Sequence, residues 1–396
     1  MQNPSLTSTS SQLCFQNADV VMPDGTVKTG AVVVDNGTID YCDFKQAPAL
    51  ESATIIDASG CYLTPGLIDA HFNGALGVGF NHASEQAMVG LFEQLPQHGI
   101  TAVMPTLITA PKADLVHQVM LLEGIIISTL DKHSSRIVGL HLEGPFINPD
   151  YRGAHPKEHI LPLTKDHCAD LLSPNTRRVT IAPEMGQNLS FIPELTEKGI
   201  ACAIGHTGAD ADMAQRAIAA GATYVTHLFN AMRSFHHREP GVAFACLMDE
   251  RTTIELIADG YHLAPETIDL ILRLKSHDKL VVTTDSNPLA GLKPGTQIEF
   301  GGQTIRVENN QTVNGEGKLA GSHLFLADHV RNLVKWGLLP FEKAVQLATG
   351  NPARYLGVEK YIGEIRPNAV ADLILWDKKT LSIKQVFVAG QPVLTR

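Results

Sequence analysis

Acidic and imidazole side chains stand at the ends of several apolar runs in this 396-residue sequence. Six runs end in this way, in Asp69-Ala70-His71, His141-Leu142-Glu143, Gly205-His206, Thr226-His227, Asp259-Gly260-Tyr261-His262 and Thr284-Asp285. So many ionisable groups converging away from water need a common cation, because unpaired buried charges are costly. Imidazole and carboxylate ligands favour a divalent transition ion, either zinc or ferrous iron. Such an ion with an open position activates water and polarises a carbonyl, so the expected reaction is hydrolysis.

The elements that must position these side chains are eight short apolar runs, each followed by a stretch of helical character. They cover 62–71, 100–106, 136–142, 178–182, 200–205, 222–226, 253–258 and 280–284. This alternation is typical of βα units around a parallel sheet. Eight units predict an α/β fold with a (β/α)8 TIM-like barrel, whose active site lies at the carboxyl ends of the strands. Periodicity alone leaves an open doubly wound sheet as the alternative.

Both ends of the chain predict short strands outside this barrel. Residues 15–58 alternate between apolar and polar around two turns, Asp24-Gly25 and Asn36-Gly37, and β-rich segments return at 371–376 and 385–389. We therefore expect a small β-sandwich module built from both termini. The predicted division is 1–59 and 356–396 for this module and 60–355 for the barrel.

Composition excludes several classes of function. The chain has 31 Lys and Arg against 41 Asp and Glu, a net charge of −10, which disfavours binding to nucleic acid or anionic membranes. Its six cysteines are scattered without a CxxC pair, so neither a disulfide framework nor a thiolate zinc site is indicated. The sequence shows no secretory signal pattern and no apolar segment of membrane-spanning length, which predicts a cytoplasmic protein without membrane contact.

The segment Pro65-Gly66-Leu67-Ile68-Asp69-Ala70-His71 resembles the first-strand motif of the amidohydrolase superfamily, and Asp285 resembles its catalytic aspartate. Within that superfamily the chain is similar to the N-acetylglucosamine-6-phosphate deacetylases. The similarity rests on motifs that run in the family's order, at 141–146, 153–155, 205–207, 226–232, 238–241, 258–262, 319–322 and 363–367. These motifs cover nearly the whole chain from about residue 60.

The resemblance implies a set of metal ligands and a catalytic base. Glu143, His206 and His227 match the family's ligands, and Asp285 matches the group that takes a proton from the attacking water and passes it to the departing amine. Many superfamily members carry His-x-His in the first motif, whereas this chain has His71-Phe72-Asn73. We therefore expect one divalent ion per subunit rather than two, zinc in preference to ferrous iron. His71 is expected to be a supporting or second-metal ligand.

The resemblance also implies the substrate and the residues that bind it. His155 matches a histidine that polarises the acetamido carbonyl, and the positions implied around the sugar phosphate are Ala154, Asn230, Ala231, Arg238, His262, Leu319, Ala320 and Gly321. The implied reaction converts N-acetyl-D-glucosamine 6-phosphate to D-glucosamine 6-phosphate and acetate in amino-sugar catabolism. The galacto epimer and a different amide are the alternatives. A homodimer is implied, in which Arg238 reaches the neighbouring subunit's site.

Overall fold

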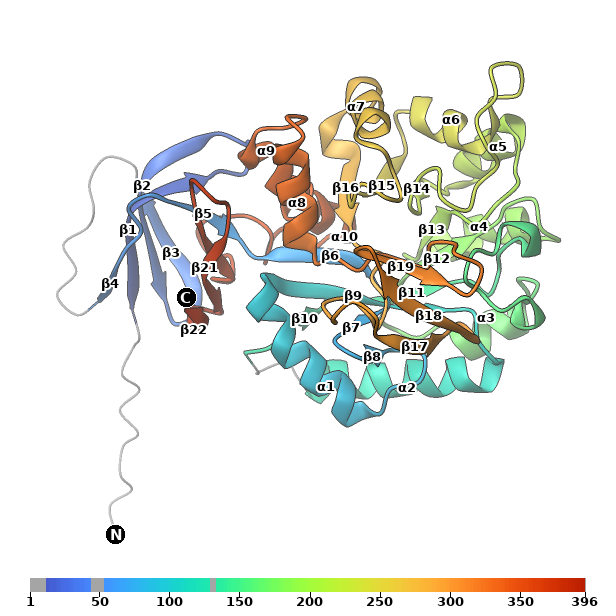
Figure 1. Cartoon of the computed structure of the whole chain (residues 1–396), viewed down its shortest axis with the longest axis horizontal. Helices are drawn as coiled ribbons and strands as arrows, with labels where there is room; N and C mark the ends of the chain where they lie inside the picture. Colours follow the sequence, from blue (N-terminus) through green and yellow to red (C-terminus); the bar gives the residue numbers. More distant parts are fainter. Residues whose placement is uncertain (1–11, 44–52, 129–132, 396) are drawn as a thin grey trace, which may run out of the picture.

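Eight parallel strands form a nearly closed barrel in the computed structural model, which describes residues 12–43, 53–128 and 133–395 (Figure 1). The strands follow one another around the barrel in chain order: β6 (Leu67–Phe72), β9 (Ile100–Ile108), β11 (Leu140–Glu143), β12 (Thr176–Ile181), β13 (Ala201–Ile204), β14 (Tyr224–Val225), β15 (Thr253–Ile257) and β16 (Leu280–Thr283). The ring closes between β16 and β6, where the Asp285 amide donates to the His71 carbonyl at 3.0 Å. The predicted barrel is confirmed, and the open sheet is wrong.

The helices pack around the barrel and cover the outer face of its strands (Figure 1). They are α1 (Glu85–Gln94), α2 (Lys112–Ser128), α3 (Lys165–Leu171), α4 (Asn188–Glu197), α5 (Ala211–Ala220), α6 (Gly241–Met248), α7 (Pro265–Leu274), α8 (Leu326–Lys335), α9 (Phe341–Gln346) and α10 (Gly350–Leu356). Local signals set some boundaries: the Asp210 side chain accepts from the Met213 amide at the start of α5, and left-handed Gly221 ends that helix. Every residue of β9 is buried, as expected for a strand covered on both faces.

Strands from both chain ends form a second, mostly antiparallel sheet, visible in Figure 1 as blue strands beside red ones. Its order is β22 (Gln391–Thr395), β21 (Ile383–Val388), β20 (Leu373–Asp377), β5 (Cys61–Pro65), β1 (Leu13–Val21), β2 (Val27–Asp35) and β3 (Thr38–Asp43), with β4 (Thr54–Asp57) paired to β1. The indole of buried Trp376 on β20 donates to Thr64 Oγ1 on β5 at 2.8 Å. This sheet is the predicted module from both termini.

The first predicted run, 62–71, is not one strand. It breaks at Gly66, so that β5 belongs to the terminal sheet and β6 to the barrel. A Cβ at Gly66 would lie 1.9 Å from Thr101 Oγ1, so the chain passes between the two sheets where a side chain does not fit. The third run is also interrupted, into β10 (Arg136–Ile137), which pairs with β9, and β11.

The glycine-rich segment after β16 forms a three-stranded antiparallel sheet of β17 (Gln297–Phe300), β18 (Gln303–Glu308) and β19 (Gln311–Asn314). A short hairpin, β7 (Gly74–Ala75) with β8 (Val78–Gly79), follows β6. Phe300 packs with Ile108, at the end of β9, in one buried cluster. The inserted sheet is thereby fixed against the carboxyl ends of the barrel strands. Among the described residues, no helix is long and apolar enough to cross a membrane.

Candidate active site

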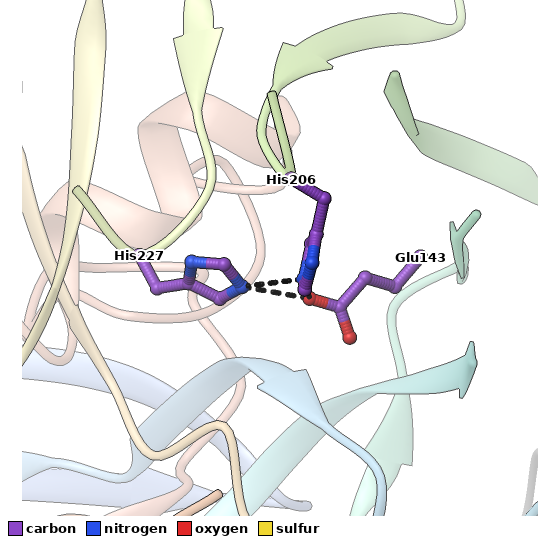
Figure 2. Close-up of side chains that lie close together, drawn as sticks. All are labelled: Glu143, His206 and His227. Carbon is purple, nitrogen blue, oxygen red and sulfur yellow. Dashed lines mark hydrogen bonds and ion pairs between the residues drawn. The ribbon is translucent and has the colours of Figure 1, made fainter. Parts of the chain in front are cut away.

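Side chains from the ends of three barrel strands meet at its carboxyl end (Figure 2). Glu143 ends β11, His206 lies two residues beyond β13, and His227 two residues beyond β14. Glu143 Oε1 lies 3.0 Å from His206 Nε2 and 2.8 Å from His227 Nε2, and the two nitrogens are 3.1 Å apart. All three side chains are buried. Three potential ligand atoms therefore point at one place.

The hydrogen bonds of His206 show that this cluster fits a cation. Its Nδ1 lies 2.9 Å from the carbonyl oxygen of Tyr151, which can only accept, so Nδ1 carries the proton. In the neutral ring, Nε2 then presents a lone pair to the carboxylate oxygen of Glu143. Two lone pairs at this distance repel each other unless a positive charge lies between them. The donor set of one carboxylate and two imidazoles fits a divalent metal ion.

The backbone is strained where it presents these side chains. His206, His227 and Asp285 have φ of +47°, +28° and +49°, values that residues other than glycine seldom adopt. Each of them lies two residues beyond the end of a barrel strand. The turn aims each side chain across the mouth of the barrel instead of along its wall. Strain concentrated at one cluster of polar residues is characteristic of functional sites.

Asp285 and His71 extend the cluster on the side of β6. His71 Nε2 lies 3.2 Å from both Glu143 Oε2 and Asp285 Oδ1, and Asn73 Nδ2 donates to Asp285 Oδ1 at 2.8 Å. Burial raises the pKa of Asp285. Burial alone would lower the pKa of His71, but the carboxylates of Glu143 and Asp285 hold it well above its usual value. The asparagine that departs from His-x-His therefore orients the carboxylate of Asp285.

Asp69 orients the turn that carries Asp285. Its carboxylate accepts from the hydroxyls of Thr283 and Thr284 at 2.8 and 2.6 Å, and from the Thr284 amide at 3.2 Å. Burial raises the pKa of Asp69 to about 6, although these hydrogen bonds oppose the shift. The aspartate of the first-strand motif thus links β6 to the end of β16, and so sets the direction of the Asp285 backbone.

His155 adds a neutral hydrogen-bond donor. The amide of Thr109 donates to its Nδ1 at 3.2 Å, so the proton of the neutral ring is on Nε2. Burial, assisted by His206, lowers the pKa of His155 to about 4, so the ring is uncharged at neutral pH. Its Nε2 lies 3.7 Å from Glu143 Oε2, within the same cavity. An N–H donor therefore points toward the carboxylate and imidazole cluster.

A cavity of about 350 Å³ opens above these groups. Its lining includes the predicted residues Glu143, Ala154, His155, His206, His227, Asn230, Ala231, His262, Asp285, Leu319, Ala320 and Gly321. His262 donates from Nδ1 to Asp259 Oδ2 at 2.7 Å. Burial would raise the pKa of Asp259, but His262 holds it far below its usual value. Eight predicted substrate positions and the polar cluster thus share one cavity.

Comparison with known proteins places the chain in a family. A model of the amidohydrolase family matches residues 62–393. The N-acetylglucosamine-6-phosphate deacetylase of Bos taurus is 36% identical over 85% of this chain and 84% of its own length. The enzyme of that name from Bacillus subtilis is 31% identical over 92% of both chains. The chain belongs to the amidohydrolase family.

Among solved amidohydrolases, a mutant N-acetyl-D-glucosamine-6-phosphate deacetylase from Mycobacterium smegmatis, in complex with N-acetyl-D-glucosamine-6-phosphate, superposes with a TM-score of 0.90. The sequences are 30% identical, and the match covers 97% of this chain and 100% of that one. The amidohydrolase family is metal-dependent, in agreement with the donor cluster of Glu143, His206 and His227. The resemblance recognised in the sequence is confirmed.

Two predicted residues of this amidohydrolase lie outside the cavity. His71 is completely buried beneath it, in contact with Glu143 and Asp285. Arg238 is exposed, in a loop where its Nη1 lies 3.1 Å from His237 Nε2. No lysine or arginine of the described chain lines the cavity. A guanidinium that pairs with a phosphate in this cavity would therefore have to come from outside the described lining.

The cavity also contains residues that sequence reasoning missed. Asp150 and Tyr151 lie in the loop just before the predicted Ala154 and His155, so their place in the chain could have indicated them. Ile108 and Phe300 line the cavity because the inserted sheet packs onto the end of β9. No local pattern in the sequence marks that contact.

Proposed function

We propose that this chain hydrolyses the N-acetyl group of N-acetyl-D-glucosamine 6-phosphate, giving D-glucosamine 6-phosphate and acetate in amino-sugar catabolism. The observation that carries the proposal is the meeting of a divalent-metal donor cluster, the carboxylate of Asp285 and the neutral donor His155 in one cavity. The names of the relatives from Bos taurus and Bacillus subtilis, and the sugar phosphate bound to the Mycobacterium smegmatis protein, support this substrate.

In this proposal, Glu143, His206 and His227 hold one zinc ion per subunit, with His71 as a supporting ligand. The mixed carboxylate and imidazole donors support zinc, with ferrous iron as the alternative. A divalent ion bound there would polarise the amide carbonyl and lower the pKa of a nearby water molecule.

In this proposal Asp285 transfers the proton and His155 stabilises the carbonyl oxygen. The Asp285 carboxylate, oriented by Asn73, takes the proton of the attacking water and delivers it to the nitrogen of the departing amine. His155 donates its Nε2–H to the carbonyl oxygen, on which negative charge develops during attack. A neutral ring suits this role because it keeps its donor at neutral pH without forming an ion pair with Glu143.

The phosphate is bound by neutral donors of one subunit and a guanidinium of the next. We assign Asn230, Ala231 and His262 of the cavity to the first group, with Leu319, Ala320 and Gly321 beside the sugar and Ala154 beside its acetamido group. Arg238 of the partner subunit is assigned to the second. The absence of Lys and Arg from the described cavity lining supports this, since a dianion requires charge-assisted hydrogen bonds.

Exposed aromatic side chains beside Arg238 support a homodimer. Phe235 and Phe244 are exposed, and their rings stack at 5.4 Å. A pair of exposed aromatic rings next to a projecting arginine is suited to an interface between subunits. A charged sugar phosphate does not cross a bilayer unaided, so we place the reaction in the cytoplasm.

Acetate release tests the proposed function directly. The metal-replete protein is expected to release acetate rapidly from N-acetylglucosamine 6-phosphate and hardly at all from N-acetylglucosamine. The phosphorylated galacto epimer is measured in parallel, and a faster rate on it would reassign the substrate. Equal rates with and without the phosphate would contradict the phosphate site. Release from none of the three would direct the search to other amides.

Arg238→Ala is expected to raise KM for the phosphorylated sugar by about 10- to 150-fold with little change in kcat, because a hydrogen bond to a charged group contributes about 1.5–3 kcal/mol. Co-expression with Asp285→Asn then tests the dimer. A mixed dimer has one site that combines Asp285 with an intact Arg238 of the partner subunit, so activity at low substrate concentration should reappear. If both variants co-purify in mixed dimers without this recovery, Arg238 does not act across the interface.

A further inference from the structure

A buried ion pair lies beneath the proposed metal site, on strands that sequence reasoning treated as apolar. Arg178 on β12 donates from Nη1 to Glu255 Oε1 on β15 at 2.5 Å and from Nη2 to the carbonyl of Ala70 at 2.5 Å. Both side chains are completely buried. Such a pair is expensive to bury and contributes little net stability, so a role beyond stability is worth seeking.

Glu255 contacts the proposed site through His71. Its Oε2 lies 3.1 Å from His71 Nδ1 and accepts from the His227 amide at 3.3 Å. Its Oε1 accepts from Arg178 and from the Tyr224 hydroxyl at 3.2 Å. Both oxygens of the carboxylate are therefore engaged, and the group is held from three strands.

The contact with Glu255 determines which nitrogen of His71 carries the proton. Glu255 is held in a buried ion pair with the guanidinium of Arg178, so its carboxylate only accepts hydrogen bonds. Nδ1 of His71 must then be the donor. A divalent ion at Glu143 would compensate the two carboxylates in place of a proton and leave the ring neutral, so that Nε2 presents a lone pair toward Glu143 Oε2 and Asp285 Oδ1, each 3.2 Å away. This is the same arrangement of facing lone pairs as at His206.

We propose that Glu255, locked by Arg178, is a positioning residue that fixes the ring orientation and tautomer of His71 and so directs Nε2 toward Glu143 and Asp285. His71 in turn fixes the carboxylates that hold the metal ion and move the proton. The inference rests on the proposed function, because it supposes a divalent ion at Glu143. A purely structural ion pair is the competing explanation.

The test compares two double variants that differ in one acceptor. Removing only one partner of the pair would leave a buried charge and destabilise the fold. Arg178→Met is therefore combined with Glu255→Gln, which retains a carbonyl acceptor for Nδ1–H, or with Glu255→Met, which has none. Both combinations remove the ion pair with similar volume. Zinc affinity of the metal-free protein is measured by competition with a chromogenic chelator, beside urea unfolding and acetate release.

We call the Arg178→Met/Glu255→Met protein the Met–Met variant and the Arg178→Met/Glu255→Gln protein the Met–Gln variant. The Met–Met variant is expected to lose zinc affinity and activity relative to the Met–Gln variant. Its zinc affinity and kcat should fall about 10- to 100-fold below those of the Met–Gln variant, as for other groups that orient a metal ligand. In a His71→Gln background the difference between the two should disappear, because a group that acts through His71 has nothing left to position.

Two outcomes would overturn the inference. Equal zinc affinity and kcat in the two double variants would leave the ion pair a structural feature, and so would a difference that persists in the His71→Gln background. Failure of the proposed function has a separate signature. If the unmodified chain bound zinc without releasing acetate, the substrate would be wrong while the affinity comparison still decided the role of Glu255. If it bound no divalent ion, both proposals would fail.

Discussion

Asp285→Asn is expected to reduce kcat for acetate release by about 10²–10⁴-fold, the range that general acid and base catalysis contributes. Asparagine has the same shape but neither takes up nor delivers the proton of the attacking water. The side chain already lies in hydrogen-bond contact with Asn73 Nδ2 at 2.8 Å, so the substitution changes its chemistry with little change of place. Steady-state acetate release and metal content per subunit are the two measurements.

The metal content distinguishes loss of the catalytic base from loss of the metal site. Glu143, His206 and His227 are unchanged in this variant, so zinc per subunit should stay near that of the unmodified protein. Asp269→Asn is the matched control, because Asp269 is a partly exposed aspartate on α7 that pairs with Arg273 at 2.9 Å. Near-normal turnover by Asp285→Asn would refute the assigned role. Loss of the metal would instead show that Asp285 is a ligand.

Glu143→Gln is expected to abolish metal retention and to lower acetate release by roughly a thousandfold or more. Glu143 is the carboxylate that faces both His206 and His227, and an amide lacks the charge that compensates a divalent ion. A bound metal contributes several kcal/mol to transition-state stabilisation, and each 1.36 kcal/mol corresponds to about tenfold in rate. Metal analysis after dialysis and acetate release give the two readouts. Glu158→Gln, an exposed glutamate of the neighbouring loop, is the control.

Metal removal gives the same test without a substitution. Chelation of the unmodified protein should stop acetate release, and added zinc should restore it. Zinc at a hundred times its dissociation constant should stabilise the metal-free protein by about 2.7 kcal/mol, whereas Glu143→Gln should gain much less. Full activity in the presence of a strong chelator, with no metal detected, would contradict the metal-dependent reaction.

The positions of most candidate site residues were predictable because each depends on a short stretch of chain. A polar residue directly after a buried parallel strand lies at the carboxyl edge of the sheet, whatever the distant parts of the chain do. His206, His227 and Asp285 each lie two residues beyond a strand and line one cavity. The start of α5 at Asp210 and its end at Gly221 were also predictable, because each depends on neighbouring residues.

Other features have no local cause. The apolar run that reads as one strand breaks at Gly66 and serves two sheets, and Thr101 on a neighbouring strand leaves no room for a side chain there. Phe300 reaches the cavity because a three-stranded insertion folds back onto Ile108. Arg238 is exposed and does not line the cavity of its own chain, although the sequence motif groups it with the residues that do.

The charged residues inside the barrel show most clearly which features the sequence determined and which only the tertiary structure decided. Glu255 interrupts Thr253-Ile254-Glu255-Leu256-Ile257, and Arg178 stands at the start of the apolar part of β12, so the sequence contains two charges that a barrel interior must neutralise. It could not show that they neutralise each other or that His71 lies between them and the proposed metal site. By itself the sequence determined the βα alternation, the edge at which polar groups gather and the family, since these follow from local periodicity and motif. Only the tertiary structure decided which buried groups meet, because contact between residues 77 positions apart depends on the closure of the barrel.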